Sequence, residues 1–449
     1  MGKNITDRFL DSLMELSEQA LSEKAVLQAK MSLIDYIACA NIGESLLHEE
    51  NEAYVSNFQE ETGISPVIGL GKKVTAVPAA TLNGMNAHAA ELDDGCRYGM
   101  FHPGAPIFSA LLALAGSRKM DAKHFLKGVV TGYEAAIRLA SAVQPGHKLR
   151  GYHASGTCGT IGAAIGLGAA LDYSQEQMKT VLSAAATDSA GILQVMDDSS
   201  KLKPYNIGRA AAAAVNAACM GRTRLSGPED ILGGERGFLK VMAQDVQEEY
   251  LVKGLGDGYA MEAIYRKPYA ACRHSHAAIE AALKLRESVL AEKMPVRRVE
   301  VSTYGLAVKG HNHIRISGPS SARMSIPYAV ASALLYGEAG YQQFEGKYLS
   351  DQRLLELTEK VEVRESKELS ALVPQKRAAV VRVETEKKVF ECRVDFPKGE
   401  PENPITKEEL EDKYRSLMQA AGREKGAAEK LLGDIWELET KVNDIWSEL

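Results

Sequence analysis

Basic side chains stand directly before several of the helices that this sequence predicts, and those helices are rich in small residues. The side chains are His102, His153, Lys203 and the group Lys267, Arg273, His274 and His276. A helix N-terminus carries about half a positive charge and presents unpaired backbone N–H groups, so these positions favour anions. If the segments converge in the fold, they form a site for a di- or tricarboxylate. The alternative is that a helical chain of 449 residues contains such residues by chance.

Segment 85–107 combines acidic groups, a histidine and a predicted helix start within one short span. His88 and Glu91 are three residues apart and therefore share a helix face. His102 lies just ahead of the next helix, whose first turn accommodates Pro106 because no backbone N–H is needed there. The alternative is a solvated turn between two packed helices.

A histidine beside a bound carboxylate is suited to remove the proton from the adjacent carbon, because its ordinary pKa lies near neutrality. We expect His102 or His153 to be this base. Lys203, Arg273 and a helix N-terminus would hold the substrate carboxylate, and the same donors would stabilise the negative charge that develops on the enolate.

A second group must then act as an acid. Tyr328 or His276 would protonate a leaving hydroxyl or, in an epimerase, return the proton on the opposite face of the carbon. Tyr328 follows Pro327 in an apolar helix, so core packing alone is the alternative for it. Cys272 is either a site residue or a buried thiol, and no acyl chemistry points to a nucleophile.

A metal site is a further alternative, since imidazole pairs occur twice in the second half of the chain. The pairs are His274 with His276 and His311 with His313, and the Asp93–Asp94 dipeptide offers carboxylates. No C-x-x-C or H-E-x-x-H motif accompanies them. We therefore expect no catalytic metal.

The composition is that of a globular protein, with 45% hydrophobic and 25% charged residues. A net charge of -6 argues against a dedicated nucleic-acid-binding protein. The six cysteines are scattered, which indicates free thiols in a reducing cytoplasm. No secretory signal and no apolar run long enough to cross a membrane is recognisable, so we expect a cytoplasmic protein.

Apolar periodicity predicts helices through the first part of the chain, and no β-type alternation stands out before about residue 250. Short strands are predicted at 299–304, 361–363, 379–383 and 388–394, the last two as a hairpin around Glu386. A helical tail follows the Pro-rich segment 397–404. The sequence thus predicts a mainly α protein. A large all-helical domain, 1–262 plus 398–449, is interrupted by a smaller α+β domain, 263–397.

Several short motifs occur along the chain in a fixed order. They are Leu-Asp-Asp…His-Pro-Gly, Gly-Tyr-His, Lys-Pro…Gly-Arg-Ala, Lys-Pro-Tyr…Cys-Arg-His-Ser-His, Ser-Ile-Pro-Tyr and Pro-Lys-Gly-Glu-Pro-Glu-Asn-Pro. In this order the chain resembles the MmgE/PrpD family over nearly its whole length. That family includes 2-methylcitrate dehydratase, cis-aconitate decarboxylase and iminodisuccinate epimerase.

The resemblance implies a helical domain with a lid domain, a homodimer, no metal or organic cofactor, and a site between the domains. It also implies a small di- or tricarboxylate substrate, and neither a nucleic acid nor a membrane as partner. Carried over by motif, the catalytic residues would be His102, His153, Lys203, Cys272 and Tyr328. The substrate-binding residues would be Glu91, Asp93, Lys267, Arg273 and His276.

Two positions depart from the pattern that such proteins usually show. Gly95 stands where a threonine is usual, and Cys272 stands where dehydratases and decarboxylases tend to carry a histidine. We predict a cofactor-independent lyase that removes a proton next to a carboxylate and eliminates water. The alternatives are a dicarboxylate epimerase or isomerase, and a carboxylate-binding protein without catalytic activity.

Overall fold

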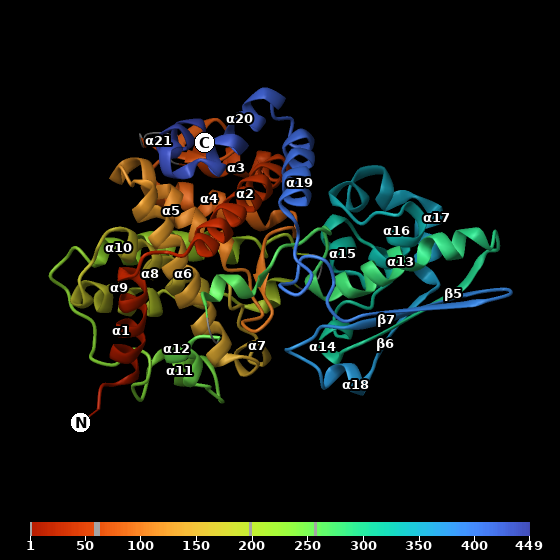
Figure 1. The fold of residues 1–449 in the computed structure, drawn as a ribbon, viewed down its shortest axis with the longest axis horizontal. Coiled ribbons are helices and arrows are strands. Elements are labelled where there is room, and N and C mark those ends of the chain that lie inside the picture. The colour runs from red at the N-terminus through yellow and green to blue at the C-terminus, as the bar shows by residue number, and fades with distance from the viewer. Residues whose placement is uncertain (1, 58–62, 197–199, 256–257) are drawn as a thin grey trace. The chain divides into compact units, whose positions relative to one another are not determined.

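A computed structural model describes residues 2–57, 63–196, 200–255 and 258–449 (Figure 1). The chain divides into two compact units. Unit 1 comprises 1–197, 202–265 and 406–449, and unit 2 comprises 198–201 and 266–405. The fold class is mainly α, as the sequence predicts, because helices make up most of the elements in both units.

Unit 1 is built from helices with a few short strands. In chain order they are α1 (Ile5–Glu18), α2 (Glu23–Leu46), α3 (His48–Ser56), β1 (Ser65–Val67), β2 (Lys72–Val74), α4 (Ala76–Ala89), β3 (Gly95–Cys96), α5 (Gly104–Arg118), α6 (Ala122–Val143), α7 (Gly146–Leu149), α8 (Cys158–Ala170), α9 (Gln175–Thr187), η1 (Leu193–Met196), α10 (Tyr205–Met220), α11 (Phe238–Met242), α12 (Glu249–Lys253), η2 (Ala260–Ala263), β4 (Ile264–Tyr265), α19 (Lys407–Ala420), α20 (Lys425–Trp436) and α21 (Leu438–Glu448).

Glycines allow helices α4 and α10 of unit 1 to pack with their backbones close together. A Cβ atom on Gly208 of α10 would lie 2.3 Å from the carbonyl oxygen of Thr81 in α4. A Cβ atom on Gly84 would lie 2.8 Å from the Cα atom of Gly208. Only residues without a side chain fit at such a contact. The contact brings the segment that follows α4 close to the segment that precedes α10, and both carry predicted site residues.

The last three helices belong to unit 1, although unit 2 precedes them in the chain. Lys413 of α19 shows one consequence of this return. Its Nζ atom donates to Asp35 of α2 at 2.6 Å and to the carbonyl oxygen of Leu92 at 2.8 Å. A C-terminal helix thereby fixes the loop that follows α4.

Unit 2 contains a four-stranded sheet with helices. Its elements are η3 (Arg273–Ser275), α13 (His276–Ala291), β5 (Val296–Thr303), α14 (Gly305–Val308), α15 (Pro319–Met324), α16 (Ile326–Tyr336), η4 (Tyr341–Phe344), η5 (Gly346–Ser350), α17 (Gln352–Glu359), β6 (Val361–Glu365), α18 (Lys367–Ser370), β7 (Ala379–Thr385) and β8 (Val389–Val394). The strand order is β6-β5-β7-β8, with β5 and β6 parallel and the other pairs antiparallel. Helix α13 packs against β7, β8 and α16.

The predicted hairpin around Glu386 is confirmed by the antiparallel pairing of β7 with β8. Alternate residues of β7 are buried, which is the pattern of a strand with one face on a core. No β-type alternation stands out before about residue 250, yet β1, β2 and β3 form there, so this part of the chain is not strictly all-helical. These strands have two or three residues each, which is too short for alternation to show. The domain boundaries and the lid role of 263–397 stay predictions.

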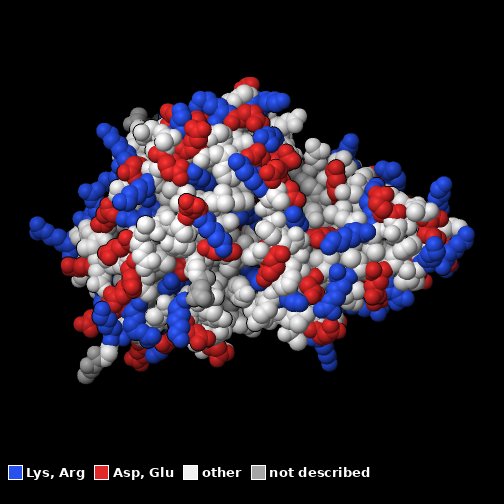
Figure 2. Space-filling view, in the orientation of Figure 1, with Lys and Arg blue, Asp and Glu red and all other residues white. Residues whose placement is uncertain are grey.

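Charged residues of both signs are interspersed on the face that Figure 2 shows, and no extended field of one sign covers it. Within the described part of the chain, none of the helices combines the length and the apolar character that crossing a membrane requires.

Candidate active site

Three histidines gather in unit 1, and we call the group formed by His88, His102 and His153 the three-histidine cluster. His88 lies in the last turn of α4, His102 in the loop before α5, and His153 ahead of α8. The ring centroid of His88 lies 4.8 Å from that of His102 and 6.3 Å from that of His153. The close packing of α4, α5, α8 and α10 therefore brings together side chains that are up to 65 residues apart in sequence.

Asp93 orients His88 at the centre of the cluster. The Nδ1 atom of His88 donates to the Oδ2 atom of Asp93 at 2.8 Å, and the histidine is only 1% exposed. Its Nε2 atom lies 3.6 Å from the Oε1 atom of Glu91. A histidine that donates from Nδ1 to a carboxylate has a fixed ring orientation and, when neutral, a lone pair on Nε2.

His102 is held in the tautomer that a base requires. Its Nδ1 atom is 2.7 Å from the carbonyl oxygen of Asp94, and a carbonyl can only accept, so Nδ1 carries the proton. The basic lone pair of neutral His102 therefore lies on Nε2. The backbone N–H of His102 donates to the Oγ atom of Ser155 at 2.9 Å, which fixes the main chain as well. Asp93 lies 3.4 Å from the same Nδ1 atom and would stabilise the protonated ring.

Asp94 holds the loop that carries His102 against the start of α5. Its carboxylate accepts from the backbone N–H of Gly104 at 3.0 Å and from the hydroxyl of Tyr133 at 2.5 Å. Burial raises the pKa of Asp94 to about 7, and the two hydrogen bonds oppose that rise only in part. Asp94 thus acts on the site by positioning His102.

His153 is held in the opposite tautomer. The Nδ2 atom of Asn206, at the start of α10, lies 3.2 Å from the Nδ1 atom of His153. The same Nδ2 atom donates to the carbonyl oxygen of Ile192 at 3.4 Å, which identifies it as the amide nitrogen. Nδ1 of His153 therefore accepts, and the ring proton lies on Nε2.

The charge of His153 is set by burial. Burial lowers the pKa of His153 well below its ordinary value, and Lys203, with His88 and His102 when these are protonated, lowers it further. His153 is consequently a neutral N–H donor near neutral pH. In these tautomers neutral His102 carries a lone pair on Nε2 and His153 carries an N–H, and both rings lie near that of His88.

Lys203 and Glu91 form an ion pair at the edge of the cluster. Their side chains are 14% and 9% exposed, so both charges are largely removed from water. Glu91 adopts a φ of 55°, a left-handed conformation that is unusual for a residue with a side chain. Such a conformation costs on the order of 1–3 kcal/mol and is typical of functional sites.

The three-histidine cluster also has the donor set of a possible cation site. Ligand atoms of His88, Glu91 and His102 all lie within 4.8 Å of one another. Glu91, however, already has a cationic partner in Lys203, which would repel a metal ion placed beside it. Lys203 therefore already supplies the positive charge that a metal ion would bring to Glu91.

The remaining predicted site residues lie in unit 2, most of them in the segment that leads into α13. Lys267 is fully buried. Arg273 pairs with Glu400, and both are buried. The Nε2 atom of His276 donates to the carbonyl oxygen of Ala271 at 3.2 Å. These contacts describe side chains that stabilise the segment from within unit 2.

Tyr328 lies in α16 of unit 2 and is fully buried. Its hydroxyl donates to the carbonyl oxygen of Gln343 at 2.8 Å, and its ring lies 5.6 Å from that of Phe344. Burial raises the pKa of the Tyr328 hydroxyl. In this geometry the hydroxyl proton is engaged by the protein, which favours a packing role over that of an acid.

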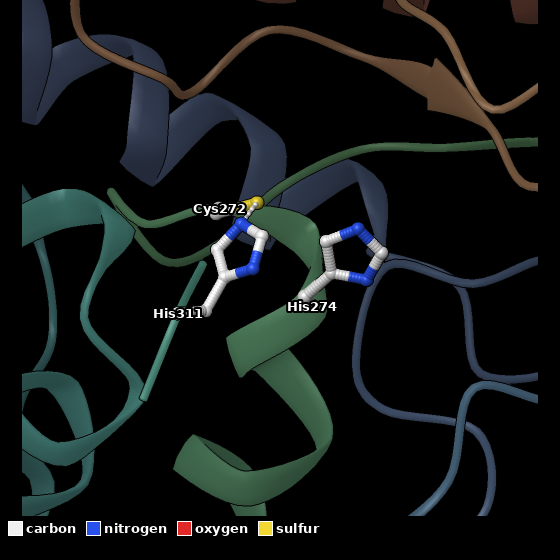
Figure 3. Close-up of side chains that lie close together, drawn as sticks. All are labelled: Cys272, His274 and His311. Atoms are coloured by element: carbon white, nitrogen blue, oxygen red, sulfur yellow. Dashed lines mark hydrogen bonds between the residues drawn. The ribbon is translucent and has the colours of Figure 1, made fainter. Parts of the chain in front are cut away.

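Cys272 lies beside two histidines of unit 2 (Figure 3). Its Sγ atom is 3.4 Å from the Nε2 atom of His311. The Nδ1 atom of His274 is 2.7 Å from the hydroxyl of Tyr304, and the rings of His274 and His311 are 4.9 Å apart. Cys272 is therefore part of a cluster of potential metal ligands and is not an isolated buried thiol.

Family models match most of this chain. The MmgE/PrpD N-terminal domain matches residues 8–250, and the MmgE/PrpD C-terminal domain matches residues 269–438. The chain belongs to the MmgE/PrpD family. The first match covers almost all of the α1–α12 region, including the three-histidine cluster, and the second includes Cys272 and its neighbours.

Curated relatives of this MmgE/PrpD chain carry one recurring name. It is 26% identical to the cis-aconitate decarboxylase-like protein oryM of Aspergillus oryzae, over 92% of this chain and 90% of that protein. It is 26% identical to a cis-aconitate decarboxylase of Aspergillus terreus, over 87% and 84% of the two chains. The human cis-aconitate decarboxylase is 23% identical, over 93% and 88%. Decarboxylation is a lyase reaction, so these similarities support a lyase-type function.

The structure brings together half of the predicted site residues. Those in unit 1 are His102, His153, Lys203, Glu91 and Asp93, and those in unit 2 are Lys267, Cys272, Arg273, His276 and Tyr328. Sequence reasoning missed Asn206, which sets the tautomer of His153, and Ser155 and Tyr133, which hold the loop that carries His102. It also missed His311 as the neighbour of Cys272. Nothing in local spacing points to these residues, since each acts on a partner at least 39 residues away.

Proposed function

We propose that this MmgE/PrpD chain is a lyase that removes a proton from the carbon next to a carboxylate of a di- or tricarboxylate and then eliminates water. One observation carries the proposal: His102 and His153 have opposite tautomers within one cluster. An elimination needs a base for the carbon-bound proton and a donor for the negative charge that follows. The three-histidine cluster offers both.

In the first step, Nε2 of His102 takes the proton from the substrate carbon. The C–H electron pair moves toward the adjacent carboxylate and forms an enolate. The N–H of neutral His153 would donate to an enolate oxygen, since a neutral imidazole is a good donor for developing charge. Asp93 and the carbonyl of Asp94 lie beside Nδ1 of His102 and would stabilise its positive charge.

In the second step, the enolate electron pair forms the new double bond and the C–O bond of the leaving hydroxyl breaks. Lys203 is an N–H donor that pairs with Glu91 in this cluster, so we assign it the proton that converts the leaving hydroxide to water. The N-terminus of α10, which begins at Tyr205, adds partial positive charge on the same side. In this scheme Tyr328 and His276 are not needed as acids.

Decarboxylation is the second candidate function, and the names of the curated relatives favour it. Loss of carbon dioxide leaves an enolate that the His153 N–H would stabilise equally well. It requires no base on carbon, however, so the lone pair of His102 would have no role in bond breaking. The two reactions are therefore distinguishable by what His102 does.

The test is incubation of the enzyme with a panel of di- and tricarboxylates in D₂O, followed by proton NMR. Elimination predicts water loss, deuterium exchange at the carbon next to a carboxylate, or both, and predicts that His102→Gln lowers the rate at least about 100-fold. The matched control is His124→Gln, which changes a partly exposed histidine in the first turn of α6. This variant is expected to have the same rate as the wild-type chain. Evolution of carbon dioxide without deuterium exchange in the remaining substrate would instead support a decarboxylase. Exchange with inversion would indicate an epimerase, and a shift in melting temperature without turnover would indicate a binding protein.

A further inference from the structure

Cys272, His274 and His311 bring three potential metal-ligand side chains together inside unit 2. Their ligand atoms all lie within 4.8 Å of one another, and Figure 3 shows His311 beside the sulfur with His274 next to this pair. We propose that these three residues form a binding site for a thiophilic transition-metal ion of the Zn²⁺ class. The proposal stands on unit 2 alone and does not depend on the lyase reaction.

Backbone hydrogen bonds hold the two arms of this Cys-His-His cluster. The N–H of Cys272 donates to the carbonyl oxygen of Arg323 at 2.8 Å. The N–H of Ile326 donates to the carbonyl oxygen of His311 at 2.8 Å. The segment where α15 meets α16 therefore anchors both the cysteine and the histidine that lies 39 residues further along the chain. A metal site needs ligands that are positioned in this way before the ion arrives.

The distance between Cys272 and His311 suits a shared tetrahedral ion. Zinc takes sulfur at about 2.3 Å and imidazole nitrogen at about 2.0–2.1 Å, so two such ligands at the tetrahedral angle are about 3.6 Å apart. The Sγ atom of Cys272 is 3.4 Å from Nε2 of His311. A thiol–imidazole hydrogen bond has a similar length, so His274 is the residue that makes the arrangement specific for a metal.

Both histidines also have the outer partners that metal-bound imidazoles usually have. The Nδ1 atom of His311 donates to the carbonyl oxygen of Lys309 at 3.0 Å, which places the lone pair of the neutral ring on Nε2. The Nδ1 atom of His274 is 2.7 Å from the hydroxyl of Tyr304, and with that hydroxyl as acceptor His274 would coordinate through Nε2. The two remaining members of the predicted histidine pairs are engaged elsewhere, His276 with Ala271 and His313 with Ser321.

The ligand set defines the chemical class of the ion. One thiolate and two imidazoles favour Zn²⁺ and Co²⁺ over Mg²⁺ and Ca²⁺, which prefer oxygen. Binding would release the thiol proton of Cys272 to the solvent, because the thiolate is the ligand. Three protein ligands leave a fourth coordination position for water or for an oxygen of a small molecule. This proposal revises the sequence-based expectation of no metal, and it takes one histidine from each predicted pair.

The test uses the full chain, freed of metal with a chelator and then titrated with Co²⁺ and with Zn²⁺. We expect one ion per chain, with a thiolate-to-Co²⁺ charge-transfer band in the near ultraviolet and the visible bands of a tetrahedral ion. Cys272→Ser should abolish the charge-transfer band, and His311→Ala should weaken affinity at least about tenfold. Cys392→Ser and His313→Ala are the matched controls and should leave both measurements unchanged.

A second measurement needs no variant and is therefore insensitive to misfolding. Alkylation of each cysteine by iodoacetamide is measured by peptide mass spectrometry. Zn²⁺ should protect Cys272 of the wild-type chain from alkylation, while exposed Cys219 reacts at the same rate with and without the metal. Equal alkylation of Cys272 in both conditions would overturn the proposal. So would a Co²⁺ spectrum without a thiolate band, or binding that Cys272→Ser leaves intact. Any of these three results would reduce the cluster to a thiol–imidazole hydrogen bond.

Discussion

The ion pair between Lys203 and Glu91 gives the most direct test of how unit 1 holds its charges. The two side chains are 14% and 9% exposed, so removal of one partner leaves the other charge largely buried. Breaking such a pair costs about 3–5 kcal/mol, mainly because the remaining ion has lost its hydration and gained nothing in return. We expect Lys203→Met to lower the free energy of unfolding by an amount in the lower part of this range, because some solvent still reaches the pair.

The double variant Lys203→Met with Glu91→Gln separates the pair from its environment. It removes both charges, and a neutral pair of similar volume is often as stable as a buried ion pair. We therefore expect the double variant to be more stable than Lys203→Met, with a coupling energy of about 1–3 kcal/mol. Turnover should be lost in both variants, because both lack the Lys203 cation. The second substitution restores stability but does not restore this charge.

Urea unfolding followed by tryptophan fluorescence is a suitable assay, because both tryptophans, Trp436 and Trp446, lie in unit 1. Lys3→Met is the matched control, since the Lys3–Asp11 pair is exposed and should contribute nothing measurable. Strictly additive effects of Lys203→Met and Glu91→Gln would refute the reasoning. They would mean that solvent screens the two charges independently.

Three further outcomes follow from the structure. Burial lowers the pKa of His147 to about 4, so the unfolded chain binds this proton more tightly and stability falls by about 3 kcal/mol as the pH drops from about 6.5 to 4. His147→Gln should flatten that part of a urea-unfolding series against pH, and superimposable curves would contradict the assignment. The pH dependence that Asp94 contributes has the opposite sign, because burial raises its pKa to about 7. Its protonated form stabilises the fold fully below about pH 4, and about 4 kcal/mol of this stability is lost as the pH rises to about 7. Asp94→Asn should remove this loss, and a variant that still destabilises over the same range would show that another group titrates there. Gly208→Ala places a Cβ 2.3 Å from the Thr81 carbonyl and should lower both the melting temperature and turnover. The control is Gly433→Ala in α20, where a Cβ meets nothing within 4 Å. It should leave turnover unchanged and raise the free energy of unfolding by about 0.5–1 kcal/mol. Equal effects of the two changes would refute the close contact between α4 and α10.

The helical character of this chain was predictable because apolar periodicity is a local property of sequence. The hairpin formed by β7 and β8 was predictable for the same reason, since alternation runs over six or seven residues in each strand. Strands β1 to β4 were not predictable from alternation. Each has two or three residues, and they pair because the surrounding helices hold them side by side.

The sequence by itself determined which side chains are candidates for chemistry and where they stand relative to predicted helix starts. Histidines before small-residue helices, a Glu-Leu-Asp-Asp segment and the ordered motifs of the MmgE/PrpD family are all properties of the linear chain. Only the tertiary structure decided which nitrogen of each histidine carries its proton and which histidines surround Cys272. Those properties depend on hydrogen-bond partners, namely the carbonyl oxygen of Asp94 for the ring of His102, Asn206 for the ring of His153 and the carbonyl oxygen of Arg323 for the backbone of Cys272. Asn206 and Arg323 are remote in sequence from their partners and come near them only in the folded chain, where glycines let α4 and α10 pack closely.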